Sequence, residues 1–438
     1  MNDDKVKKKM QIVIVGVGYV GLTAGICFAS MNYDVVCVDI DCNKISRLQN
    51  GECTIFEVGM QEMLNEVLEK NKISFTTDYE NAYKDADLIF ICVPTPESEN
   101  GDVDLKYVNQ VLKDIIPNMK KEAHIVLKST VPVGTSDEIQ KKYGINIIFN
   151  PEFLCQGEAI HNFMEPQRIV IGVSDEVSRK IMEDLYSEFD CPKLFMSLKA
   201  AEISKYACNN FLAVKLTYIN EMADLCDRLE INIEDVLSVM KLDNRIGSLY
   251  MEPGIGYGGS CLPKDTKAFS KLAAQNDVEL DLVNAAIKSN KRHRNKLLEK
   301  LDKYHPQKDK LNVAVLGLSF KSNTNDLRES QAVETIFNLC GNVNKIMAFD
   351  NKLDTLEKCK KIFREKDNVS FSNDINKTLK NSDVCMIFNR EKEILELSPK
   401  KFCELMKTPM ILDGKNCFDI PKMNYENIEY NSIGRNKK

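Results

Sequence analysis

The sequence has few of the residues that metal sites and disulfide frameworks require. Only four of its 438 residues are histidine, and no two of its fifteen cysteines lie at CxxC spacing. No zinc-finger or HExxH pattern can therefore be proposed, and the cysteines are too sparse for a disulfide scaffold. We predict no metal site, and we predict reduced thiols, which are typical of a cytoplasmic protein.

Charge and composition exclude further classes of protein. Lys and Arg number 59 and Asp and Glu number 65, so the net charge is −6, and the chain has no long basic block. This balance argues against nucleic acid or an anionic membrane as the main partner. With 43% apolar and 28% charged residues the composition is that of a globular protein, and the length predicts about two to three domains.

One uncharged stretch, from Met10 to Tyr33, is long enough in principle to span a membrane. However, it contains four glycines and runs directly into a second apolar segment, Val35–Val38. A buried strand, a glycine turn and a buried helix explain this pattern better than a membrane span. We therefore expect no membrane partner.

Strand and helix patterns alternate at both ends of the chain and enclose a helical region. IVIVGVGYVG, VVCVDID and DLIFICVP near the N-terminus correspond to VAVLGLSF, IMAFD and DVCMIFNR near the C-terminus. We predict an α/β protein with two Rossmann-like, doubly wound parallel sheets, in domains 1–198 and 304–438. The helical middle domain, 199–303, contains a long helix. The predicted strands are Gln11–Val15, Val35–Val38, Leu88–Val93, Ile125–Lys128, Ile145–Phe149, Arg168–Gly172, Asn312–Leu316, Ile346–Phe349, Val384–Phe388 and Met410–Leu412.

The first turn carries the strongest motif. Gly16, Gly18 and Gly21 form a GxGxxG pattern between a predicted strand and a helix, which suits a tight turn against a pyrophosphate. Asp39 ends the next strand, where a carboxylate accepts hydrogen bonds from ribose hydroxyls, and no Arg follows it directly. The pattern therefore favours NAD over NADP. The second copy keeps only Gly317, so we do not expect it to hold a dinucleotide in the same way.

Three later loops each follow a predicted strand, at the edge where a doubly wound sheet binds its ligand. Thr95 in VPTP and Ser129 and Thr130 in KSTVP can hydrogen-bond a cofactor, although each loop alone would be an ordinary turn. Glu152 in NPEFL lies at the same edge. A single acidic residue there is usually only solvated.

The helical region adds an amine and an amide on one helix face. Lys205 and Asn209 lie four residues apart, so their side chains share a face. They could orient a substrate alcohol and its oxyanion. A lysine that merely extends to the surface is an equally good interpretation.

The segment GIGYGGSCLPKD combines a glycine loop with a cysteine. Four glycines between Gly254 and Gly259 leave backbone bare enough for a bulky ligand. Cys261 follows, with Lys264 and Asp265 at the start of the next helix. A thiol at a helix N-terminus near an ammonium group is expected to have a lowered pKa, so we predict that Cys261 is a nucleophile.

Together these motifs resemble the UDP-glucose/GDP-mannose dehydrogenase family over nearly the whole chain. VGVGYVGL, KSTVPVG, NPEFL, DNRIG, GYGGSCLPKDT and SFKSNTNDLRES occur in the family's order. The resemblance, strongest to bacterial UDP-glucose 6-dehydrogenases, implies a four-electron oxidation of a sugar C6 alcohol to a carboxylate, UDP-glucose to UDP-glucuronate, for polysaccharide biosynthesis. It also implies that NAD is the oxidant and that Cys261 forms a thiohemiacetal and then a thioester.

The resemblance assigns further roles to matching residues. Lys205 and Asn209 would stabilise the oxyanion, Asp265 would help water to act as base, and Glu152 would assist thioester hydrolysis. Arg245 matches a substrate-binding arginine that reaches across a dimer interface, which implies a homodimer through the middle helices. The expected cofactor contacts are Gly16, Gly18, Tyr19, Val20, Gly21, Asp39, Lys44, Thr95, Ser129, Thr130, Lys264 and Arg328. The expected substrate contacts are Phe153, Leu154, Lys205, Asn209, Arg245, Tyr250, Gly254, Gly258, Phe320 and Lys321.

Two departures from the family pattern stand out. Gln156 replaces a second Glu that many members have after NPEFL, and Lys415-Asn416 occupies a segment where relatives often have Arg. Alternative functions are a GDP-mannose 6-dehydrogenase, and a non-catalytic sugar-nucleotide-binding protein of the same fold. Ser260 argues against dehydrogenases of N-acetylated UDP-hexosamines, which usually have His there.

Overall fold

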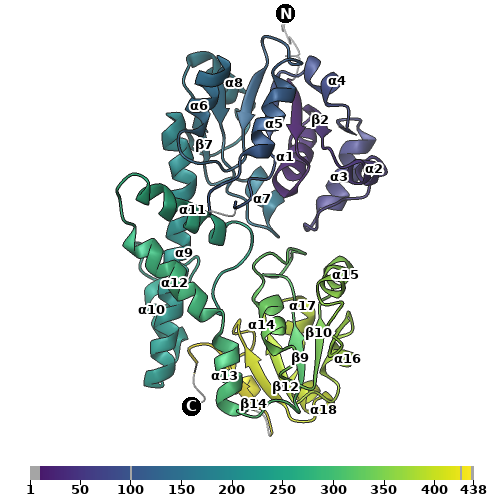
Figure 1. The fold of residues 1–438 in the computed structure, drawn as a ribbon, viewed down its shortest axis with the longest axis vertical. Helices are drawn as coiled ribbons and strands as arrows, with labels where there is room; N and C mark the ends of the chain where they lie inside the picture. Colours follow the sequence, from purple (N-terminus) through teal and green to yellow (C-terminus); the bar gives the residue numbers. More distant parts are fainter. Residues whose placement is uncertain (1–9, 99–100, 425–426, 436–438) are drawn as a thin grey trace, which may run out of the picture. The chain divides into compact units, whose positions relative to one another are not determined.

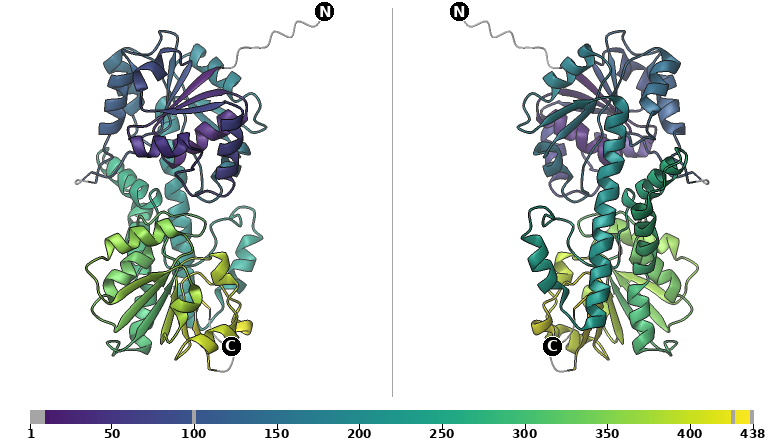
Figure 2. Two further views of the ribbon diagram at one scale, coloured as in Figure 1. Left: turned by 90° about the vertical axis from the view of Figure 1, so that its right-hand side faces the viewer. Right: turned by 90° about the vertical axis from the view of Figure 1, so that its left-hand side faces the viewer.

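A computed structural model describes residues 10–98, 101–424 and 427–435. The chain forms two compact units, one extending to Cys208 and the other beginning at Asn209. The division falls inside the longest helix, α9 (Leu198–Leu229). Each unit contains one sheet with helices on both of its faces (Figures 1 and 2).

The first unit contains an eight-stranded sheet in the order β3-β2-β1-β4-β5-β6-β7-β8. Neighbouring strands are parallel except β6 and β7, which are antiparallel. The strands are β1 (Gln11–Val15), β2 (Asp34–Val38), β3 (Ile73–Thr76), β4 (Leu88–Ile91), β5 (His124–Leu127), β6 (Ile147–Phe149), β7 (Ile169–Gly172) and β8 (Lys193–Met196).

Alternate residues of β1 serve two different cores. Ile12 and Ile14 pack with α1, α3, α7 and α8, whereas Val13 and Val15 pack with α4, α5, α6 and the start of α9. This two-sided burial explains the continuous apolar runs of the strands and confirms the doubly wound architecture. The helices are α1 (Tyr19–Ser30), α2 (Cys42–Gln49), α3 (Met60–Glu69), α4 (Tyr79–Lys84), α5 (Lys106–Ile115), α6 (Thr135–Tyr143), α7 (Ala159–Met164) and α8 (Glu176–Leu185).

The second unit contains a six-stranded, fully parallel sheet in the order β11-β10-β9-β12-β13-β14. Its strands are β9 (Asn312–Leu316), β10 (Lys345–Phe349), β11 (Val369–Ser372), β12 (Val384–Ile387), β13 (Met410–Asp413) and β14 (Glu429–Asn431). Its helices after α9 are α10 (Ile233–Lys241), α11 (Leu262–Ala274), α12 (Asp281–His293), α13 (Lys296–Tyr304), α14 (Gln331–Leu339), α15 (Leu353–Ile362), α16 (Ile375–Leu379), α17 (Lys392–Leu395), α18 (Pro399–Leu405) and α19 (Ile420–Met423).

The helical part of this unit shares a core with the second sheet. Ile219 of α9 and Leu297 and Leu301 of α13 are buried in the same cluster as Val313 and Val315 of β9. The middle helices and the C-terminal sheet therefore form one compact body.

All ten predicted strands are present, within a few residues of their predicted ends. The four strands that the sequence did not predict, β3, β8, β11 and β14, lie at the edges of the two sheets. An edge strand is covered less completely, so its sequence lacks the apolar run that marks a central parallel strand. After Cys261, the helical middle domain predicted over 199–303 divides into α11, α12 and α13.

The uncharged stretch from Met10 to Tyr33 forms β1, the glycine turn and α1, as predicted. Within the ranges that the structure describes, no helix is both long enough and apolar enough to cross a bilayer.

Candidate active site

The first glycine turn has the geometry that a dinucleotide requires. Gly16 has φ +94° and donates its N–H to Val38 O at 2.8 Å. A Cβ on Gly21 would lie 1.9 Å from Gly16 O, whereas a Cβ on Gly18 would meet no atom within 4 Å. The turn and helix packing thus require two glycines, and Gly18 leaves open space beside the N-terminus of α1, where a pyrophosphate would bind.

Asp39 closes this site from the end of β2. Its Oδ2 accepts the N–H of Val17 at 2.9 Å and the Lys44 ammonium at 3.1 Å, and its Oδ1 accepts the N–H of Asp41 at 3.0 Å. The Asp39 side chain keeps 11% of its surface exposed. The residues present therefore fit the NAD predicted from the sequence, with the acid placed to meet a ribose.

The two Thr- and Ser-containing loops are tied to one another. Thr95 Oγ1 donates to Thr130 O at 2.8 Å, and Ser129 Oγ donates to Val93 O at 2.7 Å. Both hydroxyls therefore donate to backbone carbonyls of the protein, and they fix the loops after β4 and β5. A cofactor would meet their oxygen lone pairs and the surrounding backbone.

Lys205 and Glu152 form a buried ion pair in the first unit. The Lys205 ammonium lies 3.1 Å from Glu152 Oε1 and 2.6 Å from Glu152 O, and the two side chains are only 4% and 10% exposed. Burial alone would raise the pKa of Glu152, but Lys205, the Leu154 N–H and the charge of Lys128 outweigh burial and lower it. The carboxylate is therefore ionised at neutral pH.

Phe153 lies directly beside this pair. The Arg168 guanidinium is 4.2 Å from the centre of the Phe153 ring, and Lys205 Nζ is 5.2 Å from it. Both distances suit cation–π contacts, so the aromatic ring helps to orient two cations. Leu154, in contrast, is partly buried and packs against the apolar core that includes α1 residues.

Lys128 is a buried cation that the sequence reasoning did not single out. Its Nζ donates to Asn150 Oδ1 at 3.1 Å, and Tyr186 donates to the same oxygen at 2.6 Å. Burial lowers the pKa of Lys128, although Cys92 and Glu152 oppose that effect. The signal available was its position directly after a strand, one residue before the Ser129 and Thr130 already considered.

In the second unit, Cys261 directly precedes α11, with its side chain exposed and its carbonyl accepting the Asp265 N–H at 2.8 Å. Asp265 is 1% exposed and accepts from Asn209 Nδ2 at 2.6 Å and from Lys264 Nζ at 2.7 Å. The structure thus joins an amide, an ammonium and a carboxylate at the first turn of the helix that the cysteine begins. Such a group can orient a water molecule or a substrate oxygen.

Three family models match most of the chain, each from the same family. The NAD-binding domain of the UDP-glucose/GDP-mannose dehydrogenase family matches residues 10–190, its central domain matches 199–292, and its UDP-binding domain matches 314–420. The chain belongs to the UDP-glucose/GDP-mannose dehydrogenase family. It is an NAD-dependent oxidoreductase, and the predicted cofactor and the predicted family are confirmed.

Individual relatives agree with this assignment. The chain is 36% identical to UDP-glucose 6-dehydrogenase TuaD of Bacillus subtilis, over 97% of this chain and 93% of that protein. It is also 36% identical to the UDP-glucose 6-dehydrogenase of Rickettsia felis, over 97% and 96%. Among solved structures it is similar to a UDP-glucose dehydrogenase of Pyrobaculum islandicum, with TM-score 0.89, 30% identity and 98% of both chains covered.

Two predicted ligand contacts of this dehydrogenase, Arg245 and Arg328, lie in the same local arrangement. Each guanidinium binds the carboxylate of an aspartate two residues earlier, with Nη2–Oδ2 distances of 2.6 Å to Asp243 and 2.7 Å to Asp326. The Arg245 side chain is 90% exposed. The pKa of Arg328 is raised. The main cause is its hydrogen bond to Asp326, and the nearby Cys261 adds a smaller effect in the same direction.

The glycine loop before Cys261 packs closely against other protein segments. A Cβ on Gly258 would lie 2.2 Å from Glu329 O, and one on Gly259 would lie 2.8 Å from the Phe320 ring. We expected bare backbone here to leave room for a ligand; these two glycines also serve protein packing. Gly254 donates its N–H to Asn220 Oδ1 at 2.8 Å.

Tyr19 and Val20 lie in the first turn of α1, whereas the predicted substrate contacts Tyr250, Phe320 and Lys321 lie in loops of the second unit. Tyr250 has φ +57° and is 40% exposed. Lys321 Nζ lies 5.9 Å from the ring of its neighbour Phe320. Lys415, at the departure from the family pattern, lies beside Gly254, and burial lowers its pKa.

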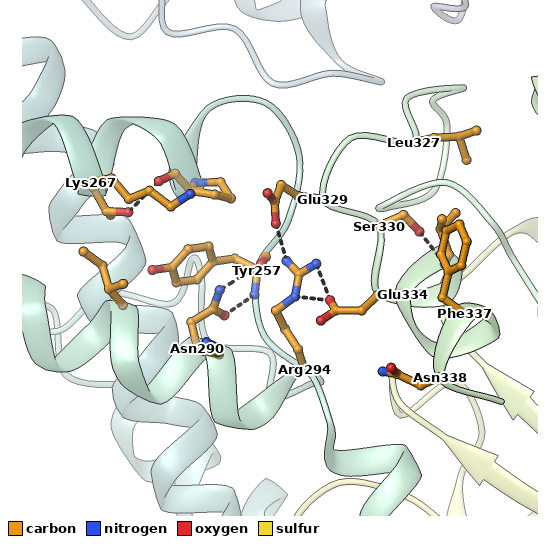
Figure 3. Close-up of a pocket in the computed structure, with 15 residues that line it drawn as sticks. Tyr257, Lys267, Asn290, Arg294, Leu327, Glu329, Ser330, Glu334, Phe337 and Asn338 are labelled. Atoms are coloured by element: carbon orange, nitrogen blue, oxygen red, sulfur yellow. Dashed lines mark hydrogen bonds and ion pairs between the residues drawn. The ribbon is translucent and has the colours of Figure 1, made fainter. Parts of the chain in front are cut away.

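A cavity of about 630 Å³ is lined by Tyr257 of the glycine loop and by residues of α11, α12 and α14 (Figure 3). Asn290 holds the loop there, because its Oδ1 accepts the Tyr257 N–H at 2.8 Å and its Nδ2 donates to Tyr257 O at 3.0 Å. Arg294 contacts Glu329 at 2.9 Å and Glu334 at 2.6 Å across the cavity wall. Cys261 is not among the residues that line this cavity, although Pro263 and Thr266 of α11 are.

Proposed function

We propose that the protein oxidises the C6 alcohol of UDP-glucose to the carboxylate of UDP-glucuronate and uses two molecules of NAD for each sugar. The observation that carries the proposal is the exposed Cys261 residue at the start of α11, next to the buried Asp265, which Asn209 and Lys264 hydrogen-bond. Relatives named UDP-glucose 6-dehydrogenase, about 36% identical over nearly the whole chain, support this sugar.

The chain's own residues have distinct roles in this reaction. When bound, NAD accepts one hydride in each of the two oxidations. In the first, the C6 hydroxyl gives its proton to a water held by Asp265 and becomes an aldehyde. The Cys261 thiolate then adds to the aldehyde carbon and forms a thiohemiacetal, so the aldehyde cannot leave. Lys205 and Asn209 stabilise the oxyanion with an ammonium and an amide donor.

The second oxidation leaves a thioester on Cys261, which water must hydrolyse. Glu152 accepts a proton from the attacking water, the C–S bond breaks, and the thiolate is restored. Its lowered pKa keeps the carboxylate ionised at neutral pH, the form that can accept a proton.

The covalent step is tested with Cys261→Ser. We expect uronate formation to fall by about 1,000-fold or more, because the hydroxyl is a far weaker nucleophile than a thiolate. Cys191→Ser, which alters a half-buried thiol in another loop, is the matched control and should keep wild-type activity. Uronate formed by Cys261→Ser at the wild-type rate would refute the covalent mechanism.

The sugar and the stoichiometry are tested together with a panel of UDP-glucose, UDP-galactose, GDP-mannose and UDP-GlcNAc. We expect two NADH for each UDP-glucose consumed. One NADH for each sugar would refute the four-electron oxidation. If GDP-mannose is turned over in preference to UDP-glucose, GDP-mannose is the substrate and the proposal of UDP-glucose is refuted.

We also propose that the protein forms a homodimer through α9. Phe211, Tyr218 and Leu225 lie seven residues apart on this helix and are 68%, 50% and 50% exposed. Seven residues make about two turns, so the three side chains form one apolar stripe, the pattern of a helix that packs against another. Phe211→Glu should convert a dimer into a monomer in light scattering. A wild-type protein that elutes as a monomer contradicts this assembly.

A further inference from the structure

Glu57 is a buried carboxylate with no part in the proposed reaction steps. It lies between α2 and α3 and is 8% exposed. Its Oε2 accepts the Tyr19 hydroxyl and the Gly157 N–H, the latter at 2.8 Å, and its Oε1 accepts the Ala159 N–H at 2.9 Å. Three donors satisfy the carboxylate without a cation, which is what allows it to be buried.

These donors come from two segments that the reaction uses. Tyr19 is the first residue of α1 and lies inside the glycine motif, two residues before Gly21. Gly157 and Ala159 belong to the turn that follows Glu152–Leu154 and begins α7. Glu57 therefore connects the dinucleotide turn to the loop that carries the Glu152 carboxylate.

The connection is tight on both sides. The Gly157 N–H also lies 3.0 Å from the Tyr19 hydroxyl oxygen, so the three groups form one closed network. Burial, followed by Glu57, raises the pKa of Tyr19, and its hydroxyl therefore remains a donor at neutral pH. On the far side, Asn162 Oδ1 accepts the Cys155 N–H at 2.8 Å and closes the loop.

We propose that Glu57 is a positioning residue, which holds the Glu152 loop in register with the cofactor-binding turn through Tyr19, Gly157 and Ala159. This inference rests on the proposed function, because it assigns Glu152 a place in the reaction. A displacement of about 1 Å in a group that must meet the reacting carbon is enough to slow a reaction about 100-fold. The dinucleotide turn itself is fixed separately, by the Gly16–Val38 hydrogen bond.

Glu57→Gln tests the proposal because it keeps the size of the side chain but replaces one acceptor oxygen by a donor. We expect kcat with UDP-glucose and NAD to fall about tenfold, while the KM for NAD changes less than about threefold. Glu62→Gln makes the same chemical change on an exposed side chain of α3 and is the matched control. A Glu57→Gln protein with wild-type kcat and only a lower melting temperature overturns the proposal.

Tyr19→Phe and the double variant test whether the two segments are coupled. Tyr19→Phe removes only the hydroxyl, so it should lower kcat about threefold, and the double variant should lower it no further than Glu57→Gln alone. Fully additive losses would overturn the coupling. If Glu57→Gln does not fold, Tyr19→Phe with unchanged kcat overturns the proposal by itself.

Hydrogen exchange gives a measurement that does not depend on turnover. In the protein without NAD, Glu57→Gln should speed amide exchange across 155–160, and Glu62→Gln should not. Unchanged exchange there would also overturn the proposal. A wild-type protein that does not oxidise UDP-glucose would instead refute the proposed function, and the exchange result would still report on the network.

Discussion

The two sheets begin with the same backbone turn but provide different environments for a ligand. In the first, the Gly16 N–H bonds to Val38 O at 2.8 Å; in the second, the Gly317 N–H bonds to Phe349 O at 2.9 Å. The acid that ends the second strand also repeats. Asp39 accepts the Val17 N–H at 2.9 Å, and Asp350 accepts the Leu318 N–H at 3.0 Å.

The side chains decide what each turn can hold. Asp350 is fully buried and also accepts from the Ser319 hydroxyl at 3.3 Å and the Lys352 N–H at 3.1 Å. A Cβ on Gly317 would lie 2.2 Å from the side chain of Asn389. In the second turn, Asn389 fills the space beside Gly317, and Asp350 is fully buried, whereas Asp39 keeps 11% of its side chain exposed. The repeat therefore preserves the folding unit and the backbone turn without preserving the open dinucleotide site of the first sheet.

The sharpest way to break the first turn is Gly21→Ala. Its Cβ would lie 1.9 Å from Gly16 O, so we expect a loss of about 1–3 kcal/mol in the free energy of unfolding and a loss of about 100-fold or more in NADH affinity. Fluorescence titration and urea unfolding measure the two effects.

Gly18→Ala is the matched variant, because its Cβ meets no protein atom within 4 Å. It should keep wild-type stability and still weaken NADH binding, since the methyl group fills the space for the pyrophosphate. Unchanged NADH affinity in Gly18→Ala would mean that the open space at this turn is not the cofactor site.

The two acids can be compared directly. Asp350→Asn should lower the free energy of unfolding by about 1–3 kcal/mol, because a buried group loses an acceptor for its donors, and should leave NADH affinity unchanged. Asp39→Asn should cost less stability and weaken NADH binding about tenfold, which is about 1.4 kcal/mol. Weaker NADH binding in Asp350→Asn would show that the second turn also serves the cofactor.

The smallest expected effect is a difference in pH response between the units. In the second, burial lowers the pKa of His293, but its bond to Asp224, at 3.1 Å, raises it overall. A raised folded-state pKa adds stability that is fully present below the unfolded pKa, about 6.5, and is lost as pH rises through the folded-state value. His293→Gln should therefore destabilise the protein more at pH 6 than at pH 8.5 in urea titrations.

The pH response of the first unit should have the opposite sign. Because the folded-state pKa of Glu152 is lowered, its stabilisation is present above the unfolded pKa, about 4.3, and is lost as pH falls through the folded-state value. The difference in free energy of unfolding between wild type and Glu152→Gln should therefore become smaller as the pH is lowered. If the loss of stability in either variant does not depend on pH, the ionisation of that pair does not contribute to the stability of its unit.

Local sequence determined the central elements and the site residues that follow them. Apolar runs predicted every central strand of both sheets, and the glycine spacing with Asp39 predicted an NAD site, because these signals depend on neighbours in the chain. The isolated Cys261, Lys205 and Glu152 were found by their positions after strands, glycines or one helix turn. The family resemblance, not spacing, supplied their roles.

Only the tertiary structure decided how distant groups meet. The edge strands, the Lys128–Asn150–Tyr186 cluster and the Glu57 network depend on residues 19 to 138 positions apart in the chain, so no local pattern marks them. The same holds for Asn389 beside Gly317 and for the Phe320 ring beside Gly259. The sequence by itself determined that two similar turns exist; packing decided that only the first has room for a dinucleotide, since the buried neighbours of the second occupy that room.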